Sequence, residues 1–160
     1  MSLTSTEQGF LRRAIELSLE KMRAGKGGPF GAVVVKGGEI VAEGWNCVTS
    51  DHDPTAHAEV VAIRRAASAL GTFDLSGCVI YSSCEPCPMC LGAIYWARLD
   101  ALVFANTRDE AASIGFDDAH FYDELAKPLH DQKLPCTHVP SEAARAVFEE
   151  WREKDDKTEY

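Results

Sequence analysis

The first apolar pattern along the chain has the spacing of an amphipathic helix. Four apolar residues recur on one helical face: Leu11, Ile15, Leu19 and Met22. Thr4 with Glu7 three residues later resembles a capping box, and the glycines that begin at Gly25 end the pattern. We therefore expect a helix over about residues 5–24.

The apolar segments that follow have strand character. Residues 30–36 and 39–46 are rich in β-branched and apolar residues, and Gly37-Gly38 between them predicts an antiparallel hairpin. Helices and short strands then alternate along the chain: helix 56–70, strand 78–82, helix 88–97 and strand 99–106. Because strands joined through a helix run parallel, this order predicts a partly parallel sheet covered by helices.

The pattern weakens after Asn106, where we expect loop and short helical pieces. Ser141 then caps a predicted helix over residues 142–154 with one apolar face: Ala144, Val147, Phe148 and Trp151. Residues 155–160 carry no pattern that would order them. Since no repeat or flexible linker divides the sequence, it predicts a single domain over residues 1–160.

Composition narrows the class of protein. The chain has 160 residues, of which 46% are hydrophobic and 26% charged, as in an ordinary globular domain. No apolar run approaches the ~18 residues of a membrane span.

The N-terminus lacks the basic start and apolar stretch of a signal peptide, so we expect a cytoplasmic protein with no membrane partner. In that reducing compartment, six cysteines indicate metal binding or catalysis.

The charge balance disfavours nucleic acid as a partner. The formal net charge is -9, from 16 basic and 25 acidic residues. The acidity is concentrated in residues 107–131, which contain seven acidic residues against Arg108 and Lys127. Binding a nucleic acid backbone depends on Lys and Arg side chains that neutralise phosphates, so this surface predicts no nucleic acid partner.

Two segments, each opening a predicted helix, carry the residue types of a metal site. Cys87 and Cys90 are three residues apart, so their sulfurs lie on one face of a helix start. His57 supplies a third ligand, and two thiolates with one imidazole suit Zn²⁺. Three protein ligands leave one position for water, which zinc makes acidic. Glu59 is then the natural general base.

His57 and Glu59 can meet at one metal ion only under a geometric condition. At about 100° per residue, they lie on nearly opposite faces of an ideal helix. We therefore expect His57 at the irregular first turn, where unpaired N–H groups also favour negative charge.

A closed structural zinc site is the alternative without catalysis. It would use Cys84 as a fourth ligand beside His57, Cys87 and Cys90. Cys84 falls between a strand end and a helix and need not face the metal, and this alternative leaves Glu59 unexplained. The remaining cysteines are expected to be buried small apolar side chains: Cys47, Cys78 and Cys136.

His-Ala-Glu at residues 57–59, followed by Pro-Cys-x-x-Cys at residues 86–90, resembles the signature of the zinc-dependent nucleoside and nucleobase deaminases. The resemblance covers about residues 5–154. It implies an α/β fold of the cytidine-deaminase type, with three α/β/α layers and a mixed five-stranded sheet flanked by helices.

Within that superfamily the chain is most similar to the small bacterial guanine deaminases. The shared stretches extend well beyond the zinc motif: 27–35, Asn46, 53–59, 83–98, 115–118 and 159–160. The resemblance implies that Asn46 and Asp118 hydrogen-bond a purine base, that Ala58 contacts it and that Phe30 stacks on it.

The same resemblance implies an assembly and a reaction. It implies a homodimer, domain-swapped through about residues 141–160, so that Tyr160 closes over the neighbouring subunit's site. The implied reaction is hydrolytic deamination of guanine to xanthine and ammonia, with one Zn²⁺ per subunit. Glu59 takes a proton from water, passes it to a ring nitrogen and later protonates the departing amine.

The zinc motif also fits different substrates, and several of the site residues also suit structural roles. A tRNA adenosine deaminase shares the zinc motif, although the acidic chain is poorly suited to RNA, and cytosine or another aminated heterocycle uses the same chemistry. Asn46 is also suited to a turn, and Asp118 to capping a short helix. A phenylalanine placed like Phe30 is more often a core residue than a stacking platform, and a terminal residue such as Tyr160 is ordinarily frayed.

Overall fold

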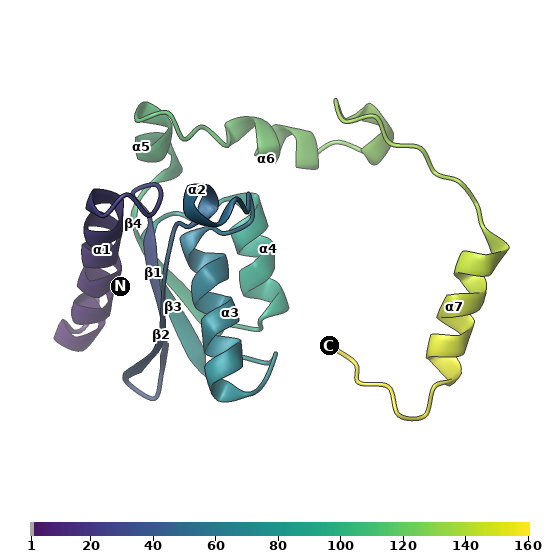
Figure 1. Ribbon diagram of the computed structural model, residues 1–160, viewed down its shortest axis with the longest axis horizontal. Coiled ribbons are helices and arrows are strands. Elements are labelled where there is room, and N and C mark those ends of the chain that lie inside the picture. Colours follow the sequence, from purple (N-terminus) through teal and green to yellow (C-terminus); the bar gives the residue numbers. More distant parts are fainter. Residues whose placement is uncertain (1) are drawn as a thin grey trace. The chain divides into compact units, whose positions relative to one another are not determined.

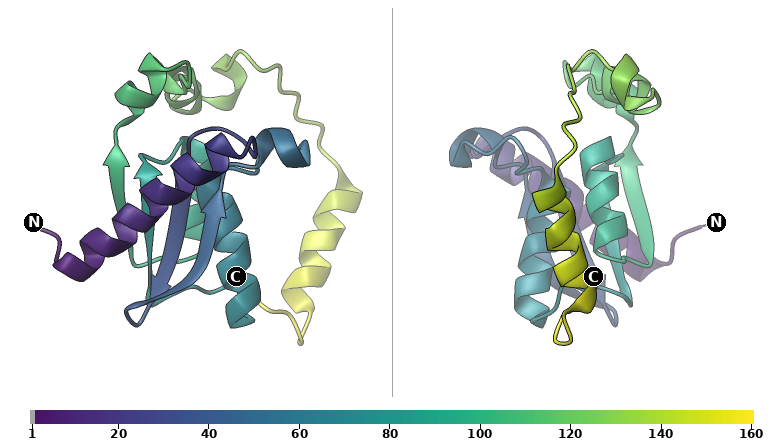
Figure 2. Two further views of the ribbon diagram at one scale, coloured as in Figure 1. Left: turned by 60° about the vertical axis from the view of Figure 1, so that its left-hand side comes forward. Right: turned by 90° about the vertical axis from the view of Figure 1, so that its right-hand side faces the viewer.

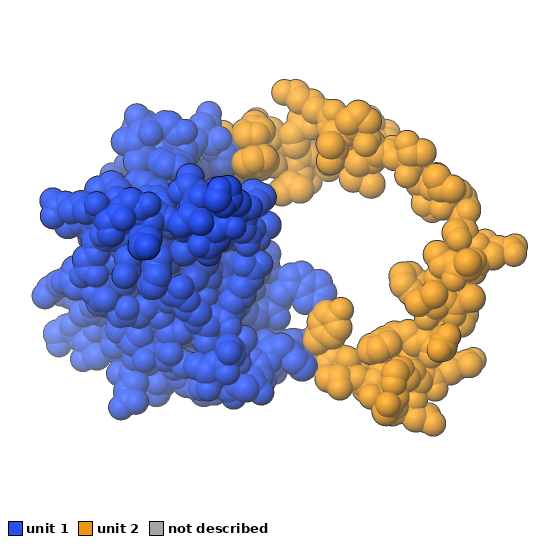
Figure 3. Space-filling model, in the orientation of Figure 1, with its two compact units in different colours: residues 1–118 blue, residues 119–160 orange. Residues whose placement is uncertain are grey.

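The computed structural model describes residues 2–160 (Figure 1). The chain divides into two compact units, one ending at Asp118 and the other spanning Ala119–Tyr160 (Figure 3). The expectation of a single domain over the whole chain stays a prediction.

The first unit is built around one sheet of four strands: β1 (Gly31–Lys36), β2 (Glu39–Trp45), β3 (Cys78–Cys84) and β4 (Ala101–Asn106). Their order across the sheet is β2-β1-β3-β4. β1 runs antiparallel to β2 and β3, whereas β3 and β4 are parallel. The mixed sheet confirms the predicted α/β class.

The strand count differs from the expectation, since the sheet within residues 2–160 has four strands and not five. The chain turns directly from β4 into a helix, α5 (Arg108–Ser113). Thr107 and Glu110 form a capping box there: the Thr107 N–H donates to Glu110 Oε2 at 2.7 Å, and Thr107 Oγ1 accepts from the Glu110 N–H at 3.3 Å. This capping box starts a helix immediately after β4 ends at Asn106, so the chain continues as a helix and not as a further strand.

Helices cover both faces of the sheet (Figure 2). They are α1 (Ser5–Arg23) on one face and α3 (Ala58–Leu70) with α4 (Pro88–Trp96) on the other, while the short α2 (Val48–Asp51) lies in the connection between β2 and α3. On one face, Leu17 of α1 packs in a buried cluster with Val33, Val35 and Tyr81. On the other face, a second cluster joins α3 and α4 to the sheet through Ala58, Ala62, Ile80 and Ile94. The predicted three α/β/α layers are therefore present in this unit.

A glycine lets α3 lie unusually close to the sheet. A Cβ at Gly44 of β2 would lie 2.2 Å from the Ala58 carbonyl oxygen and 2.5 Å from the Ala62 nitrogen. Any side chain at this position would push the helix away. Gly44 thus fixes the depth at which α3, and the residues at its N-terminus, sit on the sheet.

The second unit contains α6 (Ala119–Leu125), a short 3₁₀ turn (Leu129–Asp131) and α7 (Glu142–Glu153). Ser141 caps α7, since its Oγ accepts from the Ala144 N–H at 3.2 Å. This confirms the predicted C-terminal helix. Its apolar side chains Val147 and Phe148 are exposed.

In residues 2–160 no helix combines the length and the hydropathy needed to span a bilayer.

Candidate active site

The first half of the site is the N-terminus of α3. His57 is the N-cap of this helix, with extended backbone angles of φ -69° and ψ 156°, and Ala58 is the first helical residue. The predicted helix start at residue 56 is therefore two residues early. His57, expected at the irregular first turn, lies just before the regular helix as its N-cap, and Glu59 lies within the first turn.

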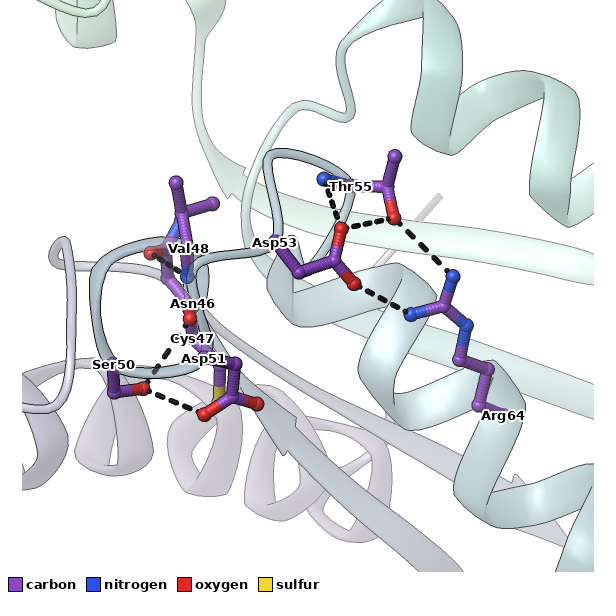
Figure 4. A network of polar contacts seen from close by, with 8 residues as sticks. All are labelled: Asn46, Cys47, Val48, Ser50, Asp51, Asp53, Thr55 and Arg64. Atoms are coloured by element: carbon purple, nitrogen blue, oxygen red, sulfur yellow. Dashed lines mark hydrogen bonds and ion pairs between the residues drawn. The ribbon is translucent and has the colours of Figure 1, made fainter.

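A polar network ties the loop before His57 to the helix after it (Figure 4). Asp53 Oδ1 accepts from the Thr55 N–H at 2.8 Å and from its hydroxyl at 2.7 Å. Arg64, on α3, donates to Asp53 Oδ2 at 3.3 Å and to Thr55 Oγ1 at 3.2 Å. The loop is thereby fastened to the helix that carries Glu59, which fixes the direction in which the chain enters the site.

The second half is the N-terminus of α4. Cys87 is the N-cap, Pro88 occupies the first helical turn, and Cys90 follows inside it. Proline suits this place because its fixed φ matches the helix and it has no N–H to leave unpaired. The two sulfurs lie 3.5 Å apart, and each lies 3.5 Å from His57 Nδ1.

The three ligand atoms fit a zinc ion. Tetrahedral zinc with Zn–S bonds of about 2.3 Å and a Zn–N bond of about 2.0 Å separates its ligand atoms by roughly 3.5–3.8 Å. The observed separations are at the lower end of this range. In residues 2–160, His57, Cys87 and Cys90 are the group with metal-binding geometry. The predicted metal site is thus assembled from residues 30 and 33 positions apart.

The two cysteines of the group differ in their affinity for a proton: the hydrogen bond with Cys87 and burial raise the pKa of Cys90, whereas the pKa of Cys87 is lowered. The hydrogen bond with Cys90 is the largest cause that lowers the pKa of Cys87 to about 4, and His57 adds to this while burial opposes it. The hydrogen bond with Cys87, aided by its negative charge, raises the pKa of His57. The lowered pKa of Cys87 favours its thiolate, the form that binds metal.

Glu59 lies against this group in the protein interior. Its Oε1 accepts a hydrogen bond from the Ser82 hydroxyl at 3.1 Å, and its Oε2 lies 3.4 Å from Cys90 Sγ. Burial is the main cause that raises the pKa of Glu59. A buried carboxyl beside a metal group, with a raised proton affinity, is suited to take up and release protons.

Cys84 is not part of the three-ligand group. Its sulfur lies 3.7 Å from the Thr107 carbonyl oxygen, and burial raises its pKa to about 11, which favours the neutral thiol. This geometry argues against the closed four-ligand alternative. Cys47 and Cys78 are buried as predicted, but Cys136 is exposed, because it lies in the loop segment between α6 and α7.

Asn46 and Phe30 lie together beyond the end of β2. Asn46 Oδ1 accepts from the Gly28 and Val48 N–H groups, both at 3.2 Å, so Asn46 does shape a turn. The Asn46 N–H also donates to the Phe30 carbonyl at 3.1 Å. The Phe30 ring packs edge-on against Phe116, with 4.8 Å between the ring centroids.

Of the other residues expected to contact the substrate, Ala58 and Asp118 belong to the first unit and Tyr160 to the second. Ala58 is fully buried at the start of α3. Burial raises the pKa of Asp118, with the charge of Cys87 adding to it, and Asp118 in turn helps to raise the pKa of His57. Asp118 therefore interacts electrostatically with the metal group. Tyr160 belongs to the second unit and is not among the residues assembled here.

Two residues at the site were not singled out from the sequence. The sequence does contain an indication for Ser82. It is the one hydroxyl residue among the alternate positions of β3 that face the interior: Cys78, Ile80, Ser82 and Cys84. Phe116 had none, since a single aromatic residue in a loop carries no periodicity. Its contact with Phe30 depends on the tertiary fold.

Residues 4–106 match the cytidine and deoxycytidylate deaminase zinc-binding region. Over 151 residues the chain is 52% identical to guanine deaminase from Bacillus subtilis, covering 94% of this chain and 97% of that protein. It is 38% identical to tRNA-specific adenosine deaminase from Haemophilus influenzae over 156 residues, 96% of this chain and 88% of that protein.

The crystal structure of guanine deaminase from Bacillus subtilis has the same fold. It superimposes with a TM-score of 0.94 at 49% sequence identity, and the match covers 99% of both chains. The similarity thus includes the segment beyond Asp118 as well as the unit that contains the metal group.

Proposed function

Because this chain belongs to the family of the cytidine and deoxycytidylate deaminase zinc-binding region, we propose that it deaminates guanine hydrolytically. Water and guanine react to give xanthine and ammonia. The observation that carries the proposal is the buried Glu59 lying against the group formed by His57, Cys87 and Cys90. The 52% identity to a guanine deaminase over nearly the whole chain supports guanine as the substrate.

Adenosine in tRNA is the less well supported substrate. The identity to the adenosine deaminase is 38%, against 52% to the guanine deaminase, at similar coverage. The chain also carries a net charge of -9, which repels a polyanionic substrate. A small neutral base encounters no such repulsion.

His57, Cys87 and Cys90 would hold the zinc ion through Nδ1 and two sulfurs. The bound ion supplies Lewis-acid chemistry that makes water nucleophilic at neutral pH. Glu59 accepts the proton of the attacking water, transfers it to a ring nitrogen of guanine and then protonates the departing amino group. Two protons thus leave the water during the cycle, and the released ammonia is neutral.

The base itself is held by side chains around the metal group. Asn46 Oδ1 already accepts two backbone hydrogen bonds, so its contact with guanine falls to the Nδ2 amide, which donates. As first residue of α3, Ala58 has an N–H with no intrahelical acceptor, which can donate to the base. Asp118 accepts from guanine N–H groups, and Phe30 stacks on the ring.

The proposal includes a homodimer that exchanges its C-terminal segments. Residues from about 141 to 160 of one subunit would cover the partner's site, with Tyr160 at the end of the tail. The exposed apolar side chains of α7 support this, because a helix with such a face needs a partner surface: Val147 at 62%, Phe148 at 74% and Trp151 at 44% exposure.

Localisation in the cytoplasm is also proposed. It is supported by the six cysteines, none of which forms a disulfide bond.

A substrate comparison tests this function. Ammonia release by zinc-loaded protein is measured with guanine, adenine, cytosine, cytidine and an RNA stem-loop under identical conditions. We expect turnover of guanine and at least about tenfold lower kcat/KM for the others, since the donor and acceptor pattern is specific to one base. Preferred turnover of the RNA or of cytosine would overturn the proposal.

A further inference from the structure

Ser82 is a polar residue on a sheet face that is otherwise apolar. Side chains at alternate positions of β3 face the cluster formed with α3, and the neighbours of Ser82 in this series are Ile80 and Cys84. In the sheet, Ser82 pairs with Ala32 of β1 and Phe104 of β4, so it lies on an inner strand. Its residue exposure is 1%, and a hydroxyl buried this deeply requires a hydrogen-bond partner.

The partner of this hydroxyl is the carboxyl group of Glu59. Ser82 Oγ donates to Glu59 Oε1 at 3.1 Å and accepts from the Cys84 N–H at 3.4 Å. The other oxygen, Oε2, lies 3.4 Å from Cys90 Sγ and hence on the side of the metal group. The two carboxyl oxygens of Glu59 therefore have different surroundings.

We propose that Ser82 is a positioning residue that holds Glu59 Oε1, so that Oε2 is the oxygen that carries the proton during deamination. This inference rests on the proposed function. A carboxyl group is free to turn about its last side-chain bond, and either oxygen can then face the substrate. Fixing Oε1 restricts that rotation, and proton transfer is fast only when donor and acceptor are held in line.

The neighbouring Ser83 shows what a structural serine looks like in the same strand. Its exposure is 5%, and its Oγ accepts from the Gly31 N–H at 3.0 Å. Ser83 thus serves the backbone of β1, whereas Ser82 donates to a side chain at the metal group. The two residues have the same chemistry and similar burial, so Ser83→Ala is the matched control for Ser82→Ala.

The test compares kcat and KM for guanine in zinc-loaded variants of the full chain. Ser82→Ala is expected to lower kcat about tenfold with KM changed less than about twofold, because the chemical step loses alignment while binding is kept. Ser83→Ala is expected to change kcat less than about twofold. Ser82→Thr restores the hydroxyl on a side chain suited to a strand and is expected to recover most of kcat.

Two further measurements separate positioning from folding. Zinc content and thermal midpoint are recorded for every variant, and Ser82→Ala should keep one zinc per chain. In the Glu59→Gln background, where the proton carrier is absent, Ser82→Ala should lower the residual rate less than about twofold. This non-additivity decides the question even if the threonine variant folds poorly.

The inference and the proposed function fail in different ways. Wild-type protein that releases no ammonia from guanine, or Glu59→Gln that keeps full activity, would overturn the proposed function. If both behave as proposed, Ser82→Ala with wild-type kcat would overturn the positioning role alone. A loss confined to KM, or one equal to that of Ser83→Ala, would also overturn it.

Discussion

His57 is the N-cap of α3, whereas Glu59, two residues later, already lies inside its first turn. The extended backbone at His57 cancels the rotation that would place the two side chains on opposite faces of a regular helix. A three-residue segment can therefore supply both a metal ligand and a proton carrier. At α4 a metal-binding residue also occupies the N-cap position: Cys87 is the N-cap and Cys90 lies in the helix.

Loss of one ligand should remove the metal. In His57→Ala or Cys87→Ala, we expect zinc content to fall from one per chain to near zero and the thermal midpoint to drop, because the residues that would hold the ion come from the N-termini of both α3 and α4. Metal analysis after dialysis checks this. The control is His138→Ala in an exposed loop, which should keep its zinc. Full zinc occupancy in both ligand variants would contradict the assigned site.

Asn46 allows binding to be separated from folding. Asn46→Asp keeps an oxygen that can accept from Gly28 and Val48 but replaces the Nδ2 donor with a second acceptor. We expect KM for guanine to rise at least about tenfold, while zinc content and secondary structure stay unchanged. Asn46→Ala, which removes both functions, should in addition be less stable. Unchanged KM in Asn46→Asp would show that Nδ2 makes no contact with the base.

The ion pair between Arg13 and Glu43 makes stability depend on pH. Arg13 donates to Glu43 Oε1 at 2.7 Å and Oε2 at 3.0 Å, joining α1 to β2. The hydrogen bond from Arg13 lowers the pKa of Glu43 below 4.5. The pair therefore stabilises the fold fully above about pH 4.5, and this contribution is lost as the pH falls through the lowered pKa.

Urea unfolding of Glu43→Gln tests this dependence. At pH 7 the variant should be less stable than wild type by about 1 kcal/mol, and the difference should shrink in acid. The control is Glu39→Gln, at an exposed position of the same strand. A difference between Glu43→Gln and wild type that is constant from neutral to acid pH would contradict the assignment.

Exchange of the C-terminal tails can be tested by complementation. Glu59→Gln lacks the proton carrier but has an intact tail, and Tyr160→Ala has the reverse defect. In a swapped heterodimer, one site combines an intact Glu59 with the partner's Tyr160. Co-expression of the two variants should then restore about a quarter of wild-type activity, from random pairing of subunits. Activity no greater than the sum of the separate variants would show that each tail serves its own subunit.

The two cysteines of the metal group could be predicted from the sequence because their information is local, whereas His57 lies 30 residues before Cys87 and was joined to them by its residue type. A cysteine spacing of three at a helix start places two sulfurs together whatever the rest of the fold does. Proline at residue 88 and the start signals at residues 53–55 mark those helix starts. The structure confirms both, with the start of α3 shifted by two residues because His57 keeps an extended backbone.

The contacts that cross the sheet could not be predicted in this way. The position of β1 between β2 and β3 depends on pairing across more than forty residues. The hydrogen bond between Ser82 and Glu59 depends on that register and on the close approach that Gly44 allows. The strand expected from Leu99 begins at Ala101, because the Leu99 N–H still donates to Ile94 and completes the end of α4.

The most direct test of the central claim is xanthine formation from guanine by wild-type and Glu59→Gln protein, each carrying one zinc per chain. The proposed mechanism predicts rapid xanthine and ammonia formation by the wild type, and a loss of at least about a hundredfold in Glu59→Gln with zinc retained. Equal turnover by the two zinc-loaded proteins would contradict the role of Glu59, and the absence of xanthine with the wild type would contradict the reaction itself.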